Sequence, residues 1–144
     1  MKVDDILKAK GRDVSTTSPD TAVIRIAQRL RLERIGALVV SGDGHRVEGI
    51  ITERDIVVAI ARDGADALGL HAADVMTRSV RTCSPDDRVR DVMVEMTNTR
   101  VRHLPVVEHG TLCGIVSIGD VVKSCLDDAD LEVRVLRDAY LGHR

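Results

Sequence analysis

The stretch Gly49-Ile50-Ile51-Thr52-Glu53-Arg54-Asp55 occurs twice in this chain, because 65 residues later it returns as Gly114-Ile115-Val116-Ser117-Ile118-Gly119-Asp120. In both copies an aliphatic run rich in β-branched residues, which favours a strand, leads to a hydroxyl residue with an aspartate three positions further on. A hydroxyl residue and an acidic residue at this spacing are typical of a capping box, in which each side chain satisfies a backbone N–H group at a helix start. Each copy therefore predicts a strand that leads directly into a helix.

The similarity between the two halves extends upstream of these stretches. Ser18-Pro19-Asp20 recurs as Ser84-Pro85-Asp86, which predicts a helix with Ser as the N-cap and Pro in the first helical position. Apolar residues follow at the i, i+3, i+4 and i+7 spacing of a helix with one buried face. They are Val23, Ile26, Ala27 and Leu30 in the first copy, and Val89, Val92, Met93 and Met96 in the second.

Each copy predicts the order strand, helix, strand, strand, helix, so the expected fold class is α/β (α+β) with two tandem repeats. The expected strands are residues 14–17, 37–40 and 47–51 in the first copy, and 80–83, 103–107 and 112–116 in the second. The sequence Asp5-Ile6-Leu7 is echoed by Asp74-Val75-Met76 ahead of the second copy. We expect a first repeat with an N-terminal lead-in helix at 1–66, a second repeat at 67–126, and a C-terminal helix and tail at 127–144.

Composition argues against several classes of protein. Lys and Arg number 21 against 23 Asp and Glu, and aromatic residues are 1% of the 144, so neither bulk charge nor aromatic stacking favours a nucleic-acid polymer as partner. No apolar stretch is long enough to span a membrane, and the N-terminus lacks a signal core. Three cysteines without a CxxC pair make a disulfide framework improbable. We therefore expect a cytoplasmic protein with no membrane partner.

These features resemble the cystathionine-β-synthase (CBS) domain pair, or Bateman module, over roughly residues 3 to 126. The resemblance rests on the two repeated stretches, on Arg102-His103-Leu104-Pro105-Val106-Val107, and on the two Ser-Pro-Asp segments. It implies that the repeats pack as a pseudo-twofold pair and that modules associate as homodimers through their repeats. It also implies that an adenosine-containing ligand, such as AMP, ADP, ATP, NAD or S-adenosylmethionine, binds between the repeats and regulates a partner protein.

The residue chemistry is compatible with such a ligand. Asp55 and Asp120 lie one turn inside their helices, where a carboxylate can accept hydrogen bonds from a ribose diol. Free N–H groups at a helix start attract phosphate. The expected phosphate-binding residues are Thr52, Ser117, Arg54, Arg102 and His103. Arg100, Arg102 and His103 form a basic cluster that could clamp a phosphate. Strand alternation predicts that Arg102 and His103 point to opposite faces, so that at most part of this cluster faces a pocket.

The adenine ring needs a flat apolar slot with backbone polar groups at its edge. The expected slot residues are Thr16, Ala37, Leu38 and Val39 in the first repeat, and Thr82, Leu104 and Pro105 in the second, with Thr16 and Thr82 taken from the family resemblance. Gly119 stands in the second copy where Arg54 stands in the first, so the two sites are expected to prefer different phosphate loads.

We expect a non-enzymatic regulatory module whose ligand is AMP, ATP or NAD, with no catalytic cofactor, no metal and an unidentified regulated partner. Hydrolase, metalloprotease and P-loop motifs are absent from the sequence, and the Cys and His residues lack zinc-ligand spacing. Two alternatives stay open. The capping boxes, contributing about 1 kcal/mol each, could be structural parts of a homodimerisation module with empty pockets. Cys83, near the expected adenine edge, could be a redox-sensing thiol.

Overall fold

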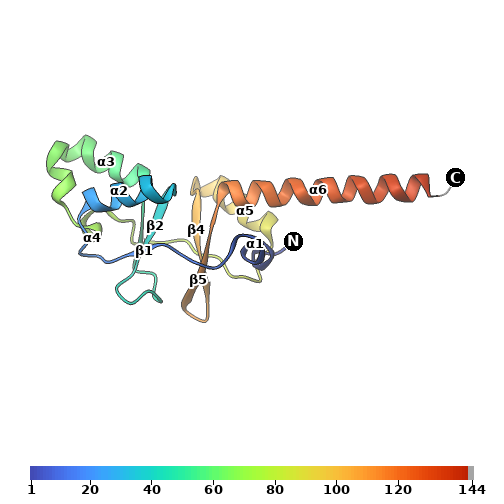
Figure 1. The fold of residues 1–144 in the computed structure, drawn as a ribbon, viewed down its shortest axis with the longest axis horizontal. Coiled ribbons are helices and arrows are strands. Elements are labelled where there is room, and N and C mark those ends of the chain that lie inside the picture. The colour runs from blue at the N-terminus through green and yellow to red at the C-terminus, as the bar shows by residue number, and fades with distance from the viewer. Residues whose placement is uncertain (143–144) are drawn as a thin grey trace.

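The computed structural model describes residues 1–142, and it contains the two expected repeats side by side (Figure 1). The first repeat consists of β1 (Thr16–Thr17), α2 (Val23–Glu33), β2 (Ala37–Val40), β3 (Gly49–Thr52) and α3 (Glu53–Asp63). The second consists of α5 (Val89–Thr99), β4 (His103–Glu108), β5 (Thr111–Ser117) and α6 (Ile118–Leu141). The helix α1 (Val3–Lys10) precedes the first repeat, while η1 (Gly64–Gly69) and α4 (Ala72–Val75) connect the two.

Each repeat is built on a small sheet. In the first sheet β1 is parallel to β2, and β2 is antiparallel to β3 with Val39 opposite Ile50. In the second sheet β4 and β5 are antiparallel, with a register shift between Val106 and Val107. The strand expected at 80–83 is reduced to a single parallel bridge between Cys83 and Val106, at the place that β1 occupies in the first repeat.

Two aliphatic cores fill the repeats, and each core receives a short helix from ahead of the other repeat. The core of the second repeat contains Val3, Ile6 and Leu7 of α1, although α1 precedes the first repeat in the chain. The core of the first repeat contains Ala72 of α4, with Val75 and Met76 packed against it. The expected lead-in helix is therefore present, and its apolar side chains pack into the second repeat.

The glycine that opens each repeated stretch occupies the contact point in this exchange of helices. A Cβ atom added at Gly114 would lie 2.6 Å from a methyl carbon of Leu7, and one added at Gly49 would collide with the Met76 side chain. Because any side chain would displace Leu7 or Met76, both positions require glycine for the close approach of the two segments. Leu7 and Met76 are equivalent in sequence, because each is the third residue of a similar tripeptide ahead of a repeat. The tripeptides are Asp5-Ile6-Leu7 and Asp74-Val75-Met76.

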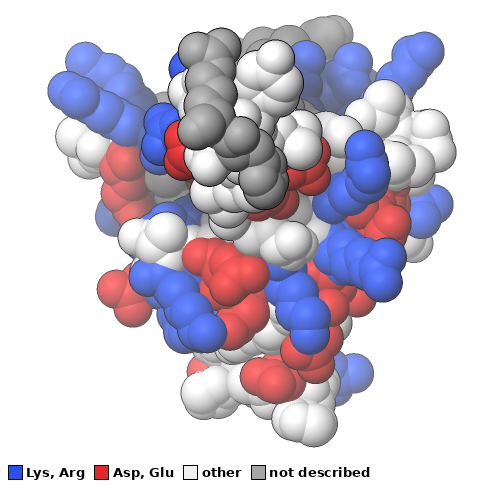
Figure 2. All heavy atoms as spheres, turned by 90° about the vertical axis from the view of Figure 1, so that its right-hand side faces the viewer, with Lys and Arg blue, Asp and Glu red and all other residues white. Residues whose placement is uncertain are grey.

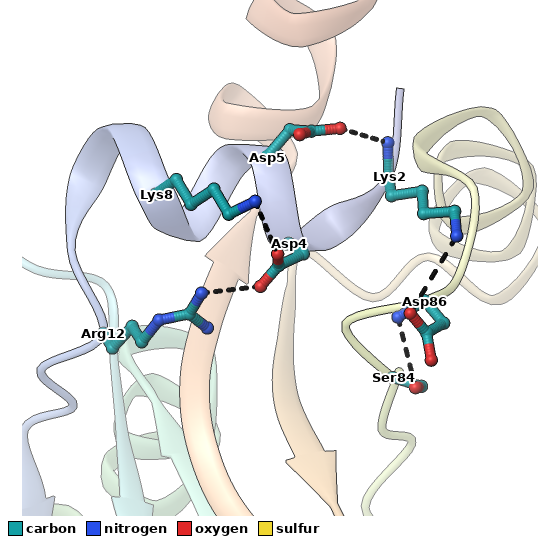
Figure 3. Close-up of polar contacts among 7 residues, drawn as sticks. All are labelled: Lys2, Asp4, Asp5, Lys8, Arg12, Ser84 and Asp86. Carbon is teal, nitrogen blue, oxygen red and sulfur yellow. Dashed lines mark hydrogen bonds and ion pairs between the residues drawn. The ribbon is translucent and has the colours of Figure 1, made fainter.

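Polar contacts hold α1 in this position (Figure 3). The backbone N–H of Lys2 donates to Asp5 at 2.9 Å, and the Lys2 ammonium lies 4.0 Å from Asp86. The Asp4 carboxylate pairs with Arg12 at 2.6 Å and with Lys8 at 3.3 Å. Hydrogen bonds from these two cations lower the pKa of Asp4.

The helix starts expected at Ser18 and Ser84 are wrong. The helices α2 and α5 begin at Val23 and Val89. Ser18 instead closes a turn in which its hydroxyl accepts from the Asp20 N–H at 3.3 Å and its carbonyl from the Thr21 N–H at 3.1 Å. Pro suits the second position of such a turn as well as the first position of a helix, so the Ser-Pro-Asp pattern does not distinguish them.

The expected C-terminal helix is present, but it continues the last helix of the second repeat without a break. α6 runs without interruption over 24 residues, from Ile118 to Leu141, and extends beyond the rest of the molecule (Figure 1). No Pro occurs between Asp120 and Leu141 and no Gly occurs there either, so the sequence offers no residue that would end the helix at 126. No helix in residues 1–142 combines the length and apolarity needed to cross a bilayer.

Charged side chains of both signs alternate over the end of the molecule from which α6 projects (Figure 2). Acidic and basic groups are neighbours across this face, without a broad area of one sign. A face of this kind lacks the continuous basic surface with which proteins bind nucleic-acid backbones.

Replacing Leu7 by Ala tests the exchange of helices. Leu7 is 1% exposed in the second core, so Leu7→Ala should lower the free energy of unfolding by about 2–5 kcal/mol in urea denaturation. The control is Leu32→Ala, since Leu32 of α2 is 77% exposed and its truncation should change stability by less than about 0.5 kcal/mol. Equal effects of the two changes would contradict a structural role for α1 in the second repeat.

Candidate functional site

A cavity of about 430 Å³ opens between the two repeats, next to the first capping box. Its lining comes from the start of α3, from the segment that follows α4, and from the segment that leads into β4. The residues are Gly36, Ile50, Thr52, Glu53, Arg54, Asp55, Thr77, Ser79, Val80, Arg81, Arg100, Val101, Arg102 and His103. The structure thus brings five of the predicted site residues together: Thr52, Arg54, Asp55, Arg102 and His103.

The predicted capping box at Thr52 is present, and it positions Asp55 at the cavity. The Asp55 N–H donates to the Thr52 hydroxyl at 3.3 Å, while the Thr52 N–H donates to the Asp55 carboxylate at 2.9 Å. The other carboxylate oxygen of Asp55 accepts from the Thr77 hydroxyl at 3.3 Å. The groups that donate to Asp55 here are neutral, and within residues 1–142 no ion pair holds its carboxylate.

Several N–H groups at the start of α3 already have partners. Those of Thr52 and Asp55 are used in the capping box, and that of Glu53 donates to the Gly36 carbonyl at 3.2 Å. The helix start therefore has less capacity for an anion than the sequence suggested. Binding of an anion in this cavity would therefore rely mainly on side chains and less on the N–H groups of the helix start.

The cavity is rich in arginine. Arg54, Arg81, Arg100 and Arg102 line it, against the carboxylates of Glu53 and Asp55. Arg81 also lies 3.5 Å from Glu95. Guanidinium groups form paired hydrogen bonds with phosphate oxygens, so this lining is suited to an anionic ligand.

Arg102 and His103 both line the cavity, contrary to the expectation that they would point to opposite faces. Leu104 of β4 points into the core. Arg102 lies before the first residue of β4, so the alternation of side chains along a strand does not determine where Arg102 points. The His103 ring packs against Gly36, where an added Cβ would lie 2.9 Å from a ring carbon. Burial lowers the pKa of His103 despite the nearby carboxylates of Glu53 and Asp120, so the ring is neutral at pH 7.

The second capping box is also present, but its aspartate has a different neighbour. Ser117 and Asp120 exchange hydrogen bonds at 2.9 and 3.2 Å. The Lys10 ammonium donates to Asp120 at 2.7 Å and to the Ile115 carbonyl at 3.1 Å. Burial raises the pKa of Asp120, but the hydrogen bonds from Lys10 and Ser117 outweigh it and leave that pKa below its usual value.

Asp120 lines a second cavity, of about 350 Å³, between α1 and α6. The lining residues are Met1, Asp5, Ile6, Ala9, Lys10, Asp120, Lys123, Ser124 and Asp127. Ser117 is not among them, and neither is any residue of the first repeat. The two aspartates that the sequence makes equivalent are thus in different states: Asp55 faces an open cavity, whereas Asp120 is held by an ion pair.

The residues predicted for the adenine slot lie elsewhere. Leu38 and Leu104 are fully buried in the two cores, and Ala37, Val39 and Pro105 are buried as well. Thr16 lies in β1, where its carbonyl accepts from Arg29 at 2.6 Å, and the exposed Thr82 does not line either cavity. These strands are apolar on both faces, so the sequence pattern did not show which side chains point away from the core.

The apolar wall of the first cavity is instead formed by Ile50, Val80 and Val101. Ile50 belongs to the repeated stretch and Val80 to the predicted strand edge, so both had a sequence signal. Thr77 and Arg81 had none as site residues, whereas Arg100 belongs with Arg102 and His103 to a basic cluster of the sequence. They come together only because the connection between the repeats folds back against β3, where Ile50 and Thr77 exchange backbone hydrogen bonds at 2.9 and 3.0 Å.

The thiols do not support a redox site. Cys83 is buried, and burial raises its pKa to about 12, so its thiolate is scarce at neutral pH. Burial also raises the pKa of Cys113. Within residues 1–142 no three His, Cys, Asp or Glu side chains are grouped in a way that would hold a metal ion.

Replacing Lys10 by Met tests the ion pair at Asp120. Because the folded-state pKa is the lower one, the pair stabilises the fold above the unfolded-state value of 3.8, and this contribution is lost as the pH falls through the folded-state pKa. Lys10→Met should raise the pKa of Asp120 in a carboxyl NMR titration. It should also lower the free energy of unfolding at neutral pH, with the difference from the parent vanishing in strong acid.

Lys123→Met is the control for this change, because Lys123 lines the same cavity without a salt bridge to Asp120 within the described residues. It should leave the pKa of Asp120 close to its value in the parent. Equal shifts in the two variants would mean that Asp120 responds to general charge and not to Lys10.

Comparison with known proteins agrees with this architecture. The family model described as CBS domain matches residues 3–62 and 72–127. The chain is 46% identical to the CBS-domain containing protein ATU1752 from Agrobacterium tumefaciens, with a TM-score of 0.83 over 86% of this chain and 98% of that structure. It is 32% identical to the mitochondrial CBS domain-containing protein CBSX3 of Arabidopsis thaliana, over 96% of this chain and 71% of that protein.

A further solved structure is the CBS domain pair of protein MJ0100 in complex with 5′-methylthioadenosine and S-adenosyl-L-methionine. It is 26% identical to this chain, with a TM-score of 0.75 over 89% of this chain and 98% of that one. The two family matches cover both repeats, including their capping boxes and the two exchanged helices. The chain therefore belongs to the CBS domain family and folds as a tandem CBS pair.

Proposed function

We propose that this CBS pair binds a phosphate-bearing adenosine ligand, namely AMP, ADP, ATP or NAD, in the cavity between its repeats. The observation that carries the proposal is the lining of that cavity: one carboxylate at a helix start, an apolar wall, and four arginines. Its volume of about 430 Å³ lies in the range of small-molecule sites. The presence of adenosine ligands in the MJ0100 complex supports the assignment of the ligand class.

In this proposal Asp55 accepts hydrogen bonds from the ribose hydroxyls. Its carboxylate is held by Thr52 and Thr77 through neutral donors, so a ligand need not displace a cation to reach it. Ile50, Val80 and Val101 contact the adenine ring. The expected slot residues Ala37, Leu38 and Val39 keep an indirect role, since they belong to β2, which pairs with the strand β3 that carries Ile50.

The arginines select for negative charge. Four guanidinium groups against two carboxylates favour a phosphate chain over the cationic sulfonium of S-adenosylmethionine. Arg54 lines the cavity from the first repeat and Arg102 from the second, and they are the residues we assign to phosphate. Burial lowers the pKa of His103 in the unliganded protein, so we assign His103 a hydrogen bond to the ligand and give the charged contacts to the two arginines.

Asp120 is proposed as the ribose-binding residue of a second, weaker site. A ligand there has to compete with Lys10 for the carboxylate, at a cost that the first cavity does not have. The first cavity should therefore fill at a lower ligand concentration than the second. The exchange of Arg54 for Gly119 is a second difference between the two sites, from which we expect them to prefer different phosphate loads.

The proposed role is regulatory and non-enzymatic, with a signal passed to a separate protein and homodimerisation through the repeats. The outer faces of the repeats support an association surface. Ile24, Val57, Val58 and Ile60 are 40–63% exposed on α2 and α3, and Val94 is 50% exposed on α5. A ligand can change such an association only through different affinities for the two arrangements.

A ligand panel tests the proposal. Protein stripped of bound nucleotide should be stabilised by AMP, ADP, ATP or NAD, by about 2.7 kcal/mol at a hundredfold excess over Kd, which is a rise in Tm of roughly 5–10 °C. Arg102→Gln should weaken ATP binding at least about tenfold in calorimetry while leaving adenosine binding unchanged, because it removes a charged hydrogen bond to phosphate. The matched control is Arg90→Gln, at an exposed arginine of α5 outside the cavity.

The panel also decides between the proposal and a module with empty pockets. Stabilisation by no member of the panel would favour a structural dimerisation module. Stabilisation by S-adenosylmethionine in preference to ATP would contradict the role given to the arginines. An equal loss of ATP affinity in Arg102→Gln and Arg90→Gln would show a general charge effect.

Asp55→Asn tests the ribose contact separately from the capping box. The change removes the charge that accepts from the ribose hydroxyls, and it should weaken adenosine and ATP alike by about 1.5–3 kcal/mol. Asp74→Asn is the matched control, because Asp74 has the same capping position in α4 and accepts from the His71 N–H at 2.9 Å, but it does not line either cavity. Loss of stability in both variants with unchanged affinity in both would remove Asp55 from the site.

A further inference from the structure

The outer half of α6 has no neighbour in the described chain. Val121 and Ser124 anchor its first turns in the second repeat, but every residue from Ala129 to Leu141 is exposed. In Figure 1 this half of the helix extends away from the two repeats. A helical segment of this length is only marginally stable in water without a packing partner.

An apolar stripe runs along the exposed side of α6. Its members follow one another at alternating intervals of four and three residues, which is the a/d spacing of a coiled coil. They are Val122, Leu126, Ala129, Val133, Leu136 and Tyr140. The five larger side chains are 42–73% exposed, and the stripe covers three heptads. We call these six residues the α6 seam.

We propose that the α6 seam of one copy packs against the α6 seam of a second copy as a parallel, two-stranded coiled coil. The seam faces away from the anchoring residues Val121 and Ser124, so the repeats of each copy lie outside the pair. In one heptad Val133 falls at an a position and Leu136 at a d position, a combination that favours two parallel strands. The other a positions hold Leu126 and Tyr140, and the other d positions hold Val122 and Ala129. This association is separate from ligand binding and from the contacts proposed between the repeats.

Charge complementarity determines the direction of the pair. In a parallel coiled coil a g residue faces the e residue five positions later on the partner helix. Here Glu132 is at g and Arg137 is at e, so each copy of Glu132 faces an arginine of the other copy. The pair would form twice by symmetry, at the outer end of the helix, where the surrounding residues are exposed.

Other apolar residues on the same helix provide a matched control. Leu131 and Val135 are 59% and 58% exposed but fall at f and c positions, outside the seam. Val133→Gln with Leu136→Gln, and Leu131→Gln with Val135→Gln, each replace one Val and one Leu in the same part of α6. The two double variants therefore lose the same apolar surface and the same helix propensity, and they differ only in the side of the helix that changes.

Sedimentation equilibrium of the full chain without nucleotide tests the association. The parent should self-associate, the seam variant should have a Kd at least about tenfold higher, and the off-seam variant should match the parent. Circular dichroism verifies that both variants keep the parent fold. A monomeric parent, or equal association of the two variants, would overturn the proposal. Weakening by Val57→Gln with Ile60→Gln but not by the seam changes would assign the contact to the repeats and also overturn it.

Disulfide trapping tests the direction. In a parallel pair an a residue faces its own copy, so Val133→Cys should form a covalent dimer on mild oxidation, while Val135→Cys and the parent should not.

Reversing one charge by Glu132→Lys should weaken association, and adding Arg137→Glu should restore it. Covalent dimers from Val135→Cys but not from Val133→Cys would contradict the seam, and failure of the double charge reversal to restore association would contradict the parallel direction. Because no ligand is present, these results are independent of the nucleotide proposal.

Discussion

Two contacts between a short helix and a glycine hold the architecture together: Leu7 on Gly114 and Met76 on Gly49. In each contact a residue from the segment ahead of one repeat packs against a glycine of the other repeat. That glycine lies in the strand that leads into the capping box. The strands β3 and β5 therefore lie at fixed positions against α4 and α1, and the helices α3 and α6 begin where these strands end. Since a close-packed interior transmits a change in volume to its surroundings, a side chain at either glycine would move both the core and the helix start.

The same two contacts explain why the repeats differ in their sites. Thr77 directly follows Met76 and donates to Asp55, whereas Lys10 lies three residues after Leu7 and donates to Asp120. One lead-in segment thus places a neutral donor at its aspartate, and the other places a cation. The backbones of the two repeats are similar, but the residues that reach the two aspartates differ. Asp55 therefore remains accessible, whereas Asp120 is in an ion pair. His103 lies within electrostatic reach of both aspartate environments, because Glu53, Lys10 and Asp120 all act on its ring.

The sequence predicted what depends on residues close together in the chain. The repeated stretch, the two capping boxes, the tandem order of elements and the presence of Asp55 beside Arg54 all follow from local patterns. The exchange of α1 and α4 did not, because helix periodicity identifies an apolar face but not the core that receives it. The apolar lining of the first cavity was not predicted for a similar reason: strands such as Ala37–Val40, buried along their whole length, give no alternation from which a face can be read. Lys10 and Asp120 are 110 residues apart, and no local rule connects them.

The uninterrupted course of α6 also has a mechanical consequence. Its first turn contains Asp120, and its last described turn lies 24 helical residues from the cap, a distance of about 36 Å at the rise of an α-helix. Without Pro or Gly between these points, the helix acts as a lever whose short arm is embedded in the second repeat. A tilt of roughly 10° at the embedded end would displace the free end by about 6 Å, so a rearrangement too small to alter the core is amplified into a movement larger than one helical turn.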